Sequence, residues 1–193
     1  MIAIIEYGAG NTRSVMNALD RLNVRYELTD IPEKIMAAEK VIFPGVGHAK
    51  HAMNVLKSKG LDEVIRSVTS PLLGICVGMQ LLYEYSEEGD TECLGLIKGS
   101  IVKFDDNQLI VPQIGWNTIT HNDNPLFKDL GQSPWFYAVH SYYAKTGEYT
   151  AATSTYGVEY CSAVQKDNFF GTQFHPEKSS SNGHQLLKNF IEL

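Results

Sequence analysis

Residues 71–82 read PLLGICVGMQLL, an apolar stretch with two glycines, one placed two residues before Cys76 and one two residues after it. The run 72–76 has the length and composition of a buried β-strand, and we expect a helix to follow that carries residues 80–82. A buried strand that passes directly into a helix is typical of α/β proteins with a parallel sheet.

Three further strands are predicted upstream of this one, at residues 2–6, 26–29 and 41–43. Helical patterns lie between the strands, and Asn11 is a candidate cap for the first helix. Strands and helices that alternate in this way predict a mainly parallel sheet with helices on both faces, whose active site lies beyond the carboxyl ends of the strands. The apolar faces of the helices are Val15, Ala18, Leu19 and Leu22, then Leu61, Val64, Ile65 and Val68.

The pattern changes after about Glu87, where β-branched and aromatic residues alternate with Gly, Pro and Asn. Such segments predict additional antiparallel strands that continue or flank the sheet. A last helix is expected at residues 183–193. We therefore predict a mixed α/β fold and a single domain at residues 1–193. The strand-like segments are GSIVKF (99–104), GWNTIT (115–120), PWFYAVHSYYA (134–144) and YTAATSTY (149–156).

Charge and composition exclude several classes of function. The net charge is −6, and no cluster of Lys and Arg marks a nucleic-acid or anionic-membrane surface. The N-terminus MIAIIEYGAG lacks the features of a signal peptide and no segment has the length of a membrane span, so we expect a cytoplasmic protein. Three cysteines without a CxxC pair predict neither a disulfide framework nor a thiolate metal site, and we expect no metal and no cofactor.

The segment around Cys76 has the form GxCxG, a nucleophile elbow with cysteine in the place of serine. The glycines at 74 and 78 remove side chains that would collide across so sharp a turn. Backbone N–H groups at the start of the following helix favour the thiolate, which is the attacking form. Taken alone, the same pattern also fits a buried structural cysteine in a tight turn.

A general base is predicted at His175, which lies in GTQFHPEKS two residues before Glu177. A cysteine nucleophile, an imidazole that accepts its proton and a carboxylate that orients the imidazole form a complete catalytic triad. His140 is a second candidate for the base, although no carboxylate lies near it in the sequence. His48 and His51 stand three residues apart, and we interpret them as surface residues because two histidines are weak evidence for a metal.

An oxyanion hole is predicted from FPGVG at 43–47, which ends a strand with two glycines. The N–H groups of Gly45, Val46 and Gly47 are candidates to face the nucleophile, and Val77 supplies a second donor. Glycines after a strand also serve ordinary turns, so this motif depends on the elbow for its interpretation.

Taken together, the elbow GICVGMQ, FPGVG and FHPEK closely resemble class I glutamine amidotransferases. Other segments are similar to the glutaminase subunits of imidazole glycerol phosphate synthases of histidine biosynthesis, and the resemblance covers nearly the whole chain. These segments are EYGAGNTRSV (6–15), GLIKG (95–99), VPQIGWN (111–117), YAVHSY (137–142) and QFHPEKSS (173–180) with LLKNF (186–190).

The resemblance implies a flavodoxin-like class I amidotransferase fold and assigns a role to each matching position. It makes Cys76 the nucleophile, His175 the general base and Glu177 the carboxylate that orients it. It places Gln80, with the backbone around Ser141 and Tyr142, in the pocket for the amino-acid end of L-glutamine. Residues implied to lie at or near a partner are Asn11, Trp116, Tyr137 and Lys178.

The partner implied by the resemblance is a (β/α)8-barrel cyclase, with which the chain forms a heterodimer. In that family ammonia passes through a buried tunnel to the cyclase, which forms imidazole glycerol phosphate and aminoimidazole carboxamide ribotide. The chain departs from the family pattern at four positions outside the triad. Glu6 stands where Asp is more common, Gln113 where His is usual, and His48 and Lys50 where smaller or aromatic residues are common.

Three alternatives remain open from the sequence. A paralogous amidotransferase that feeds another acceptor, such as a surface sugar, would carry out the same chemistry, and only the partner distinguishes the two. A partner-independent cysteine hydrolase of the same fold is disfavoured by Gln80 and the HSYY segment. A non-catalytic regulatory module is disfavoured because all three triad roles are occupied.

Overall fold

A computed structural model describes residues 1–8 and 11–193 of the chain. Five parallel strands form one half of a twelve-stranded sheet, in the order β2-β1-β3-β4-β14. The four strands predicted in the first half are all present, so the prediction of a mainly parallel core is confirmed. The five parallel strands are β1 (Ile2–Ile5), β2 (Tyr26–Thr29), β3 (Lys40–Gly45), β4 (Leu72–Cys76) and β14 (Phe169–Thr172).

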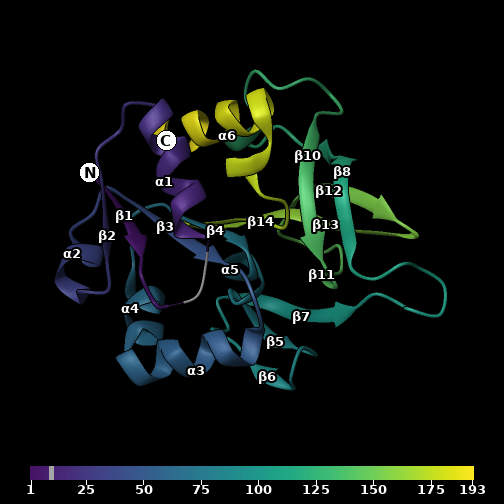
Figure 1. The fold of residues 1–193 in the computed structure, drawn as a ribbon, viewed down its shortest axis with the longest axis horizontal. Helices are drawn as coiled ribbons and strands as arrows, with labels where there is room; N and C mark the ends of the chain where they lie inside the picture. Colours follow the sequence, from purple (N-terminus) through teal and green to yellow (C-terminus); the bar gives the residue numbers. More distant parts are fainter. Residues whose placement is uncertain (9–10) are drawn as a thin grey trace.

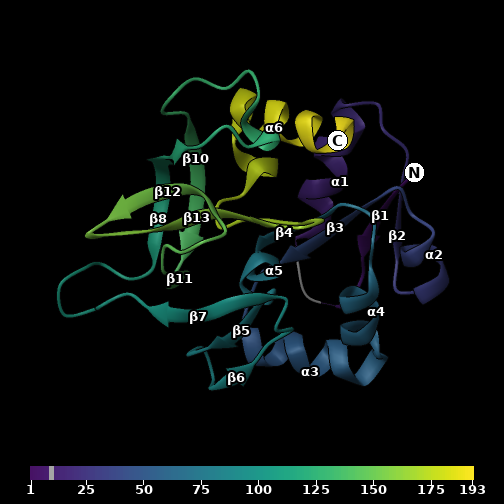
Figure 2. The same ribbon diagram turned by 180° about the vertical axis from the view of Figure 1, so that it is seen from behind.

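Helices cover both faces of this parallel half (Figure 1), and the view from behind shows the same layers (Figure 2). On one face lie α1 (Thr12–Arg21) and α6 (Ser180–Glu192), and on the other α3 (Ala49–Lys59) and α4 (Leu61–Ser67). The short α2 (Pro32–Met36) lies near the β2 end of the sheet. None of the helices in residues 1–8 and 11–193 is long and apolar enough to cross a membrane.

The ends of these helices agree with the local sequence chemistry in most places. The Asn11 side chain accepts a hydrogen bond from the Ser14 N–H at 3.3 Å, which confirms the predicted cap of α1. Leu22 is the residue that follows α1 rather than part of it. The last helix begins at Ser180, three residues before the predicted start, and α2 has only five residues, too few for a periodic pattern to reveal.

The second half of the chain extends the sheet with mostly antiparallel strands, as the sequence predicts. One pair departs from this, because β5 runs parallel to β7, and β5 begins before the predicted change at Glu87. The added strands are β13 (Val158–Lys166), β11 (Tyr142–Ala144), β7 (Ile97–Lys103), β5 (Tyr83–Ser86) and β6 (Thr91–Glu92), with β12 (Thr150–Tyr156) and β9 (Thr120–His121) beside β13.

A separate antiparallel ribbon of β8 (Gln113–Thr118) and β10 (Trp135–His140) flanks the large sheet. It lies at the end of the molecule opposite α2 (Figure 1). The segment 134–144, which reads as one strand-like stretch, breaks at Ser141, and its two parts join different sheets. Two short 3-10 helices complete the chain, η1 (Pro125–Phe127) and η2 (Pro176–Lys178).

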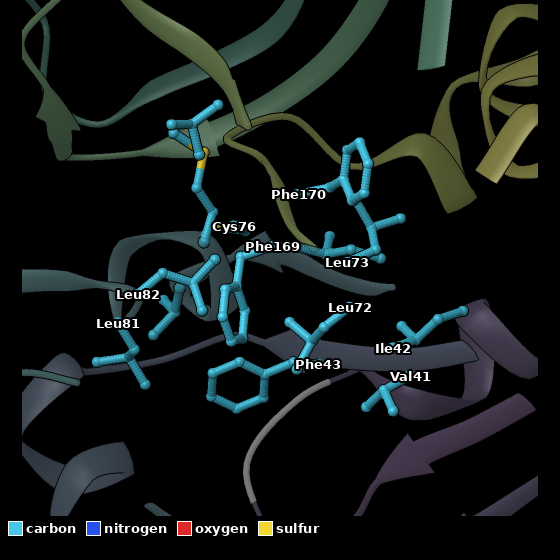
Figure 3. Packing of buried hydrophobic residues seen from close by; sticks show 14 of the residues in the cluster. Val41, Ile42, Phe43, Leu72, Leu73, Cys76, Leu81, Leu82, Phe169 and Phe170 are labelled. Atoms are coloured by element: carbon cyan, nitrogen blue, oxygen red, sulfur yellow. The ribbon is translucent and has the colours of Figure 1, made fainter. Parts of the chain in front are cut away.

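The core lies where β3, β4 and β14 pack between the helical layers (Figure 3). Phe43, Leu72 and Leu73 are fully buried, and Phe169 and Phe170 of β14 pack in the same cluster. Burial of each such side chain stabilises the fold by about 1.5–3 kcal/mol. The carboxyl ends of the three strands therefore rest on a closely packed base, and this base positions the candidate site.

The helix after the elbow is shorter than predicted. α5 (Val77–Gln80) has four residues and ends at Gln80, so the predicted helical positions Leu81 and Leu82 lie outside it. Both leucines are buried in the core cluster, and their apolar character reflects this packing rather than a helical face.

Candidate active site

Cys76 lies at the carboxyl end of β4 with φ 54° and ψ −112°, a backbone conformation that is rare for a residue with a side chain. The glycines around it are required by space. A Cβ on Gly74 would lie 2.8 Å from the carbonyl carbon and oxygen of Gly78, and a Cβ on Gly78 would lie 2.0 Å from the Phe43 carbonyl oxygen. The elbow thus has the steric cause that the GxCxG spacing indicates.

Neighbouring parallel strands bring the other groups to the same edge of the sheet. Gly45 at the end of β3 pairs with Cys76, and Thr172 at the end of β14 pairs with Ile75. The chain continues from Thr172 to His175, the residue just before η2. The 99-residue separation between the cysteine and the histidine in the sequence is therefore closed by the pairing of β14 with β4.

His175 and Glu177 form a buried pair, with 2.8 Å between Nδ1 of the imidazole and Oε1 of the carboxylate. Burial lowers the pKa of His175, but hydrogen bonds to Cys76 and Glu177, together with the negative charges of both, raise it by more, so the net pKa lies above its ordinary value. The arrangement favours the imidazolium form of His175.

A cavity of about 290 Å³ opens in front of Cys76. Ten of the residues singled out in the sequence line it, contributed by four different parts of the chain. They are Val46, Gly47, Cys76, Val77, Gln80, His140, Ser141, Tyr142, His175 and Lys178.

Gly45 and Gly47, both predicted for the oxyanion hole, have different surroundings. A Cβ on Gly45 would lie 2.2 Å from the Gly78 nitrogen, so this glycine allows the FPGVG loop to pack against the elbow. Gly47 has φ +95° and open space where a Cβ would be, so its conformation rather than space requires glycine. Val46 and Gly47 line the cavity, whereas Gly45 lies behind them against Val77 and Gly78.

The Gln80 side chain is buried, and its amide nitrogen donates two hydrogen bonds within the protein. Its Nε2 donates to the Tyr142 carbonyl oxygen at 3.0 Å and to Gln173 Oε1 at 3.0 Å. Its own Oε1 is the polar atom left for a ligand in the cavity.

His140 lines the same cavity but differs from His175 in its charge. Its Nδ1 lies 2.8 Å from the Tyr142 carbonyl oxygen, and since a carbonyl only accepts, Nδ1 carries the proton. Burial lowers the pKa of His140 to about 4, so the ring is neutral near pH 7. Its Nε2 is buried and has no hydrogen-bond partner among residues 1–8 and 11–193. The carboxylate partner expected of a triad histidine is found on His175.

The remaining histidine pair lies away from this arrangement. His48 and His51 are exposed, and Nδ1 of His48 accepts a hydrogen bond from the Lys50 N–H at 3.2 Å as the cap of α3. Within the described part of the chain, no three His, Cys, Asp or Glu side chains are grouped so that they could hold a metal.

An exposed apolar surface adjoins the cavity on the outer face of β8 and β10. Trp116 and Tyr137 face each other across the ribbon, with ring centroids 6.1 Å apart in a T-shaped arrangement. Ile114 and Trp135 on the same face are 64% and 55% exposed. We call this surface, formed by Ile114, Trp116, Trp135 and Tyr137, the ribbon face.

The ribbon is joined to the triad through the main chain. The His175 N–H donates to the Tyr137 carbonyl oxygen at 2.8 Å, and the Tyr137 N–H donates to Ser179 Oγ at 3.0 Å. Val139 and the exposed Lys178 both line the cavity. α1, which Asn11 caps, contacts η2, which carries Lys178.

Two polar residues at the site are not identified by the sequence reasoning. Glu88 lines the cavity, and its carboxylate accepts a hydrogen bond from the Ala49 N–H at 2.7 Å. Gln173 Nε2 lies 3.8 Å from Cys76 Sγ. The sequence signal for Gln173 is its place two residues before His175, and Glu88 lies in a surface-like SEEGD segment without a motif.

Comparisons with known proteins identify the family to which the chain belongs. The family model for glutamine amidotransferase class-I matches residues 3–193. This chain belongs to the class I glutamine amidotransferase family. The amidotransferase is 46% identical over 194 residues to the imidazole glycerol phosphate synthase subunit HisH of Bacteroides fragilis, covering 100% of this chain and 99% of that protein. It is 48% identical over 192 residues to the corresponding subunit of Pasteurella multocida, covering 99% and 97%.

Solved structures share the fold of this amidotransferase at low sequence identity. A crystal structure of a glutamine amidotransferase aligns with a TM-score of 0.75 and 18% identity, covering 100% of this chain and 98% of that one. The structure of PurLQS from Thermotoga maritima aligns with a TM-score of 0.71 and 18% identity, covering 99% and 97%. The flavodoxin-like amidotransferase fold with additional antiparallel strands is thus confirmed.

Proposed function

We propose that this amidotransferase is the glutaminase subunit of an imidazole glycerol phosphate synthase and that Cys76, His175 and Glu177 carry out its chemistry. The observation that carries the proposal is the shared cavity, in which the elbow cysteine meets a histidine whose Nδ1 lies 2.8 Å from a buried carboxylate. The HisH relatives at 46–48% identity support the choice of synthase. The whole of residues 1–193 serves as one glutaminase domain.

The reaction follows from the protonation of the site. The Cys76 thiolate attacks the carboxamide carbon of L-glutamine, and the N–H groups of the FPGVG loop and Val77 stabilise the oxyanion that forms. The His175 imidazolium gives its proton to the leaving nitrogen, so ammonia departs and a thioester remains. Water, deprotonated by His175, then attacks the thioester, and glutamate leaves as the thiolate re-forms.

Recognition of the substrate's amino-acid end is proposed for the opposite side of the cavity. Oε1 of Gln80 and the Glu88 carboxylate are acceptors that suit the α-ammonium group of glutamine. The backbone at Ser141 and Tyr142 completes this wall. Glu88 is also held in place by the Ala49 N–H, which lowers the cost of orienting it.

We propose that the ribbon face receives the (β/α)8-barrel cyclase subunit. The ribbon face carries two exposed tryptophans and a half-buried tyrosine, which belong to the residue types that most often anchor a protein interface. Lys178 at the rim of the cavity and Asn11 at the start of α1 extend the proposed interface. Ammonia released at Cys76 passes from there to the cyclase, in the cytoplasm and without a cofactor.

The test is steady-state kinetics with purified components. We expect slow glutamate release from the chain alone, faster release with the cyclase and its acceptor ligand, and stoichiometric formation of imidazole glycerol phosphate. A native complex that contains a sugar-modifying enzyme instead would identify the paralogous alternative. Full and partner-independent hydrolysis of glutamine would contradict the subunit proposal.

A further inference from the structure

We propose that Gln173 is a positioning residue that donates a hydrogen bond to the Cys76 thiolate and that Gln80 fixes its orientation. The proposal rests on the role of Cys76 given above. Gln173 is fully buried, and its Nε2 lies 3.8 Å from Cys76 Sγ. Gln80 is also buried, and the two side-chain amides form what we call the amide pair.

The direction of every hydrogen bond in the amide pair follows from one backbone carbonyl. The Tyr142 carbonyl oxygen can only accept, so Gln80 must turn its NH₂ group toward it, at 3.0 Å. The same NH₂ group lies 3.0 Å from Gln173, which must therefore present its Oε1 to it. The NH₂ group of Gln173 is thereby left to face Cys76 Sγ. A flipped amide at either position would place two oxygens or two NH₂ groups in contact.

The surroundings of the sulfur indicate what this donor does. Val139 presents its carbonyl oxygen to Sγ at 3.8 Å, and that oxygen can accept only from the thiol form. Gln173 directs an N–H group toward the sulfur, and a hydrogen bond donated to sulfur favours the thiolate. Gln173 thus offsets the unfavourable contact between the Val139 carbonyl and the thiolate. It also restrains the rotation of the Cys76 side chain.

The amide pair also connects the substrate pocket to the nucleophile. Gln80 lines the cavity, whereas Gln173 is buried behind it and reaches Cys76 and Gln80. Loss of Gln80 is therefore expected to affect both the KM for glutamine and kcat. Loss of Gln173 is expected to lower kcat with little change in KM.

Other titratable groups also face the sulfur, and the test must separate their effects from that of Gln173. His175 just before η2, His140 from β10 and Tyr7 after β1 lie around Cys76. Glu88 and Lys178 line the same cavity. These groups are unchanged in Gln173 variants, so a difference from the wild-type pH profile reports on the amide alone.

The experiment measures the rate at which iodoacetamide alkylates Cys76, followed by mass spectrometry between pH 5 and 10, together with glutaminase kinetics in the assembled complex. Gln173→Met removes the donor with little change in length, and Gln173→Glu replaces it with a charged acceptor. We expect the alkylation midpoint to rise by about one pH unit in Gln173→Met and by more in Gln173→Glu, with kcat about tenfold lower and KM within about twofold. The exposed Gln132→Glu is the control for the charge change.

Unchanged alkylation profiles in folded Gln173 variants would overturn the inference, even if their thermal stability fell. If neither Gln173 variant folds, Gln80→Leu provides the test. In this variant Gln173 loses the partner that orients it, so the pH midpoint of Cys76 alkylation should again rise. An unshifted midpoint in Gln80→Leu would also overturn it. Failure of the proposed function would look different, since Cys76→Ala would then keep its glutaminase activity whatever the Gln173 variants show.

Discussion

The parallel half and the antiparallel half of the molecule contribute different things to the site. The parallel strands β3, β4 and β14 end together and place Gly45, Cys76 and His175 at one edge, over a core that is buried on both faces. The β8–β10 ribbon supplies His140 and the wall at Val139, and its outer face is exposed. The proposed reacting groups thus stand on the parallel half, whose core is buried on both faces, while the antiparallel half forms the opposite wall of the cavity and carries the exposed ribbon face.

The largest effect is expected on the parallel side, at the nucleophile. Cys76→Ala should abolish glutamate release, because the thiol that lines the cavity belongs to Cys76. Cys93→Ala and Cys161→Ala should retain activity, since both thiols are buried elsewhere and burial raises the pKa of each. Residual activity of Cys76→Ala at the wild-type level would refute the proposed chemistry, as would labelling of Cys93 or Cys161 in preference to Cys76 by a glutamine-like electrophile.

The next largest effect separates the two partners of the buried pair. His175→Ala should lower kcat by about 10²–10⁴-fold, because the imidazole moves protons in both half-reactions. Glu177→Ala should cost less, since the carboxylate only orients and stabilises the ring. Glutamate release by both variants at equal enzyme concentration measures the difference. Near-wild-type activity in both would mean that the base lies on the antiparallel side, with His140 the first candidate.

A third prediction concerns how much a partner bound on the antiparallel half raises the rate of glutamine hydrolysis at Cys76. The chain alone should hydrolyse glutamine about 10²–10³-fold more slowly than the complex, the range expected when one oxyanion donor is missing. Gly47, at φ +95° with free space around it, is where the loop can rotate. Activation by cyclase and acceptor should therefore appear in kcat. Activation confined to KM, or a lone chain running at the full rate, would show that the loop is already in place.

A smaller effect is expected on the ribbon face itself. Trp116→Ala should weaken binding of the cyclase subunit by about 30-fold or more, the size typical of a buried aromatic anchor. Isothermal titration calorimetry with the purified cyclase measures this affinity. Ile31→Ala is the control, because Ile31 is 42% exposed and directly precedes α2, and α2 lies at the end of the molecule opposite the ribbon. Equal affinities for the two variants would place the interface elsewhere.

The smallest effect is on stability and compares the two buried histidines. His140 has a folded-state pKa of about 4 against an ordinary value of 6.5. As the pH falls, this imidazole therefore binds a proton in the unfolded chain before it does so in the folded chain. The stability that its neutral form contributes is present above pH 6.5 and declines by about 2 kcal/mol toward pH 5. The raised pKa of His175 acts in the opposite direction, giving stability at low pH that is lost as the pH rises through that pKa.

Chemical denaturation of His140→Asn between pH 7 and 5 isolates the contribution of His140 to the pH dependence of stability. The variant should lose less stability over this range than the wild type does. His184→Asn, at an exposed position on α6, should follow the wild type. Parallel curves for His140→Asn and the wild type would show that the buried ring does not titrate as described.

The two halves also differ in what the sequence could reveal. The strands β1, β3 and β4 are largely apolar runs, and the elbow and the His175–Glu177 pair are local motifs, so their positions could be predicted, whereas β14 is not among the predicted strands. The break at Ser141 could not, because it depends on β10 pairing with β8 while β11 pairs with β7. Gln173 and Cys76 meet only through the pairing of β14 with β4, 97 residues apart in the sequence, and no local pattern encodes that contact.

The way β10 contacts His175 determines which substitutions on this strand leave that contact intact. The contact from β10 to His175 runs through the Tyr137 carbonyl oxygen, a main-chain atom that every amino acid carries. The side chains of the ribbon face stand roughly perpendicular to that hydrogen bond, which lies in the pairing direction of the strand. Substitutions on this face can therefore accumulate while the hydrogen bond to His175 is retained. On β10 the exposed surface depends on side chains, whereas the contact with His175 depends on the main chain.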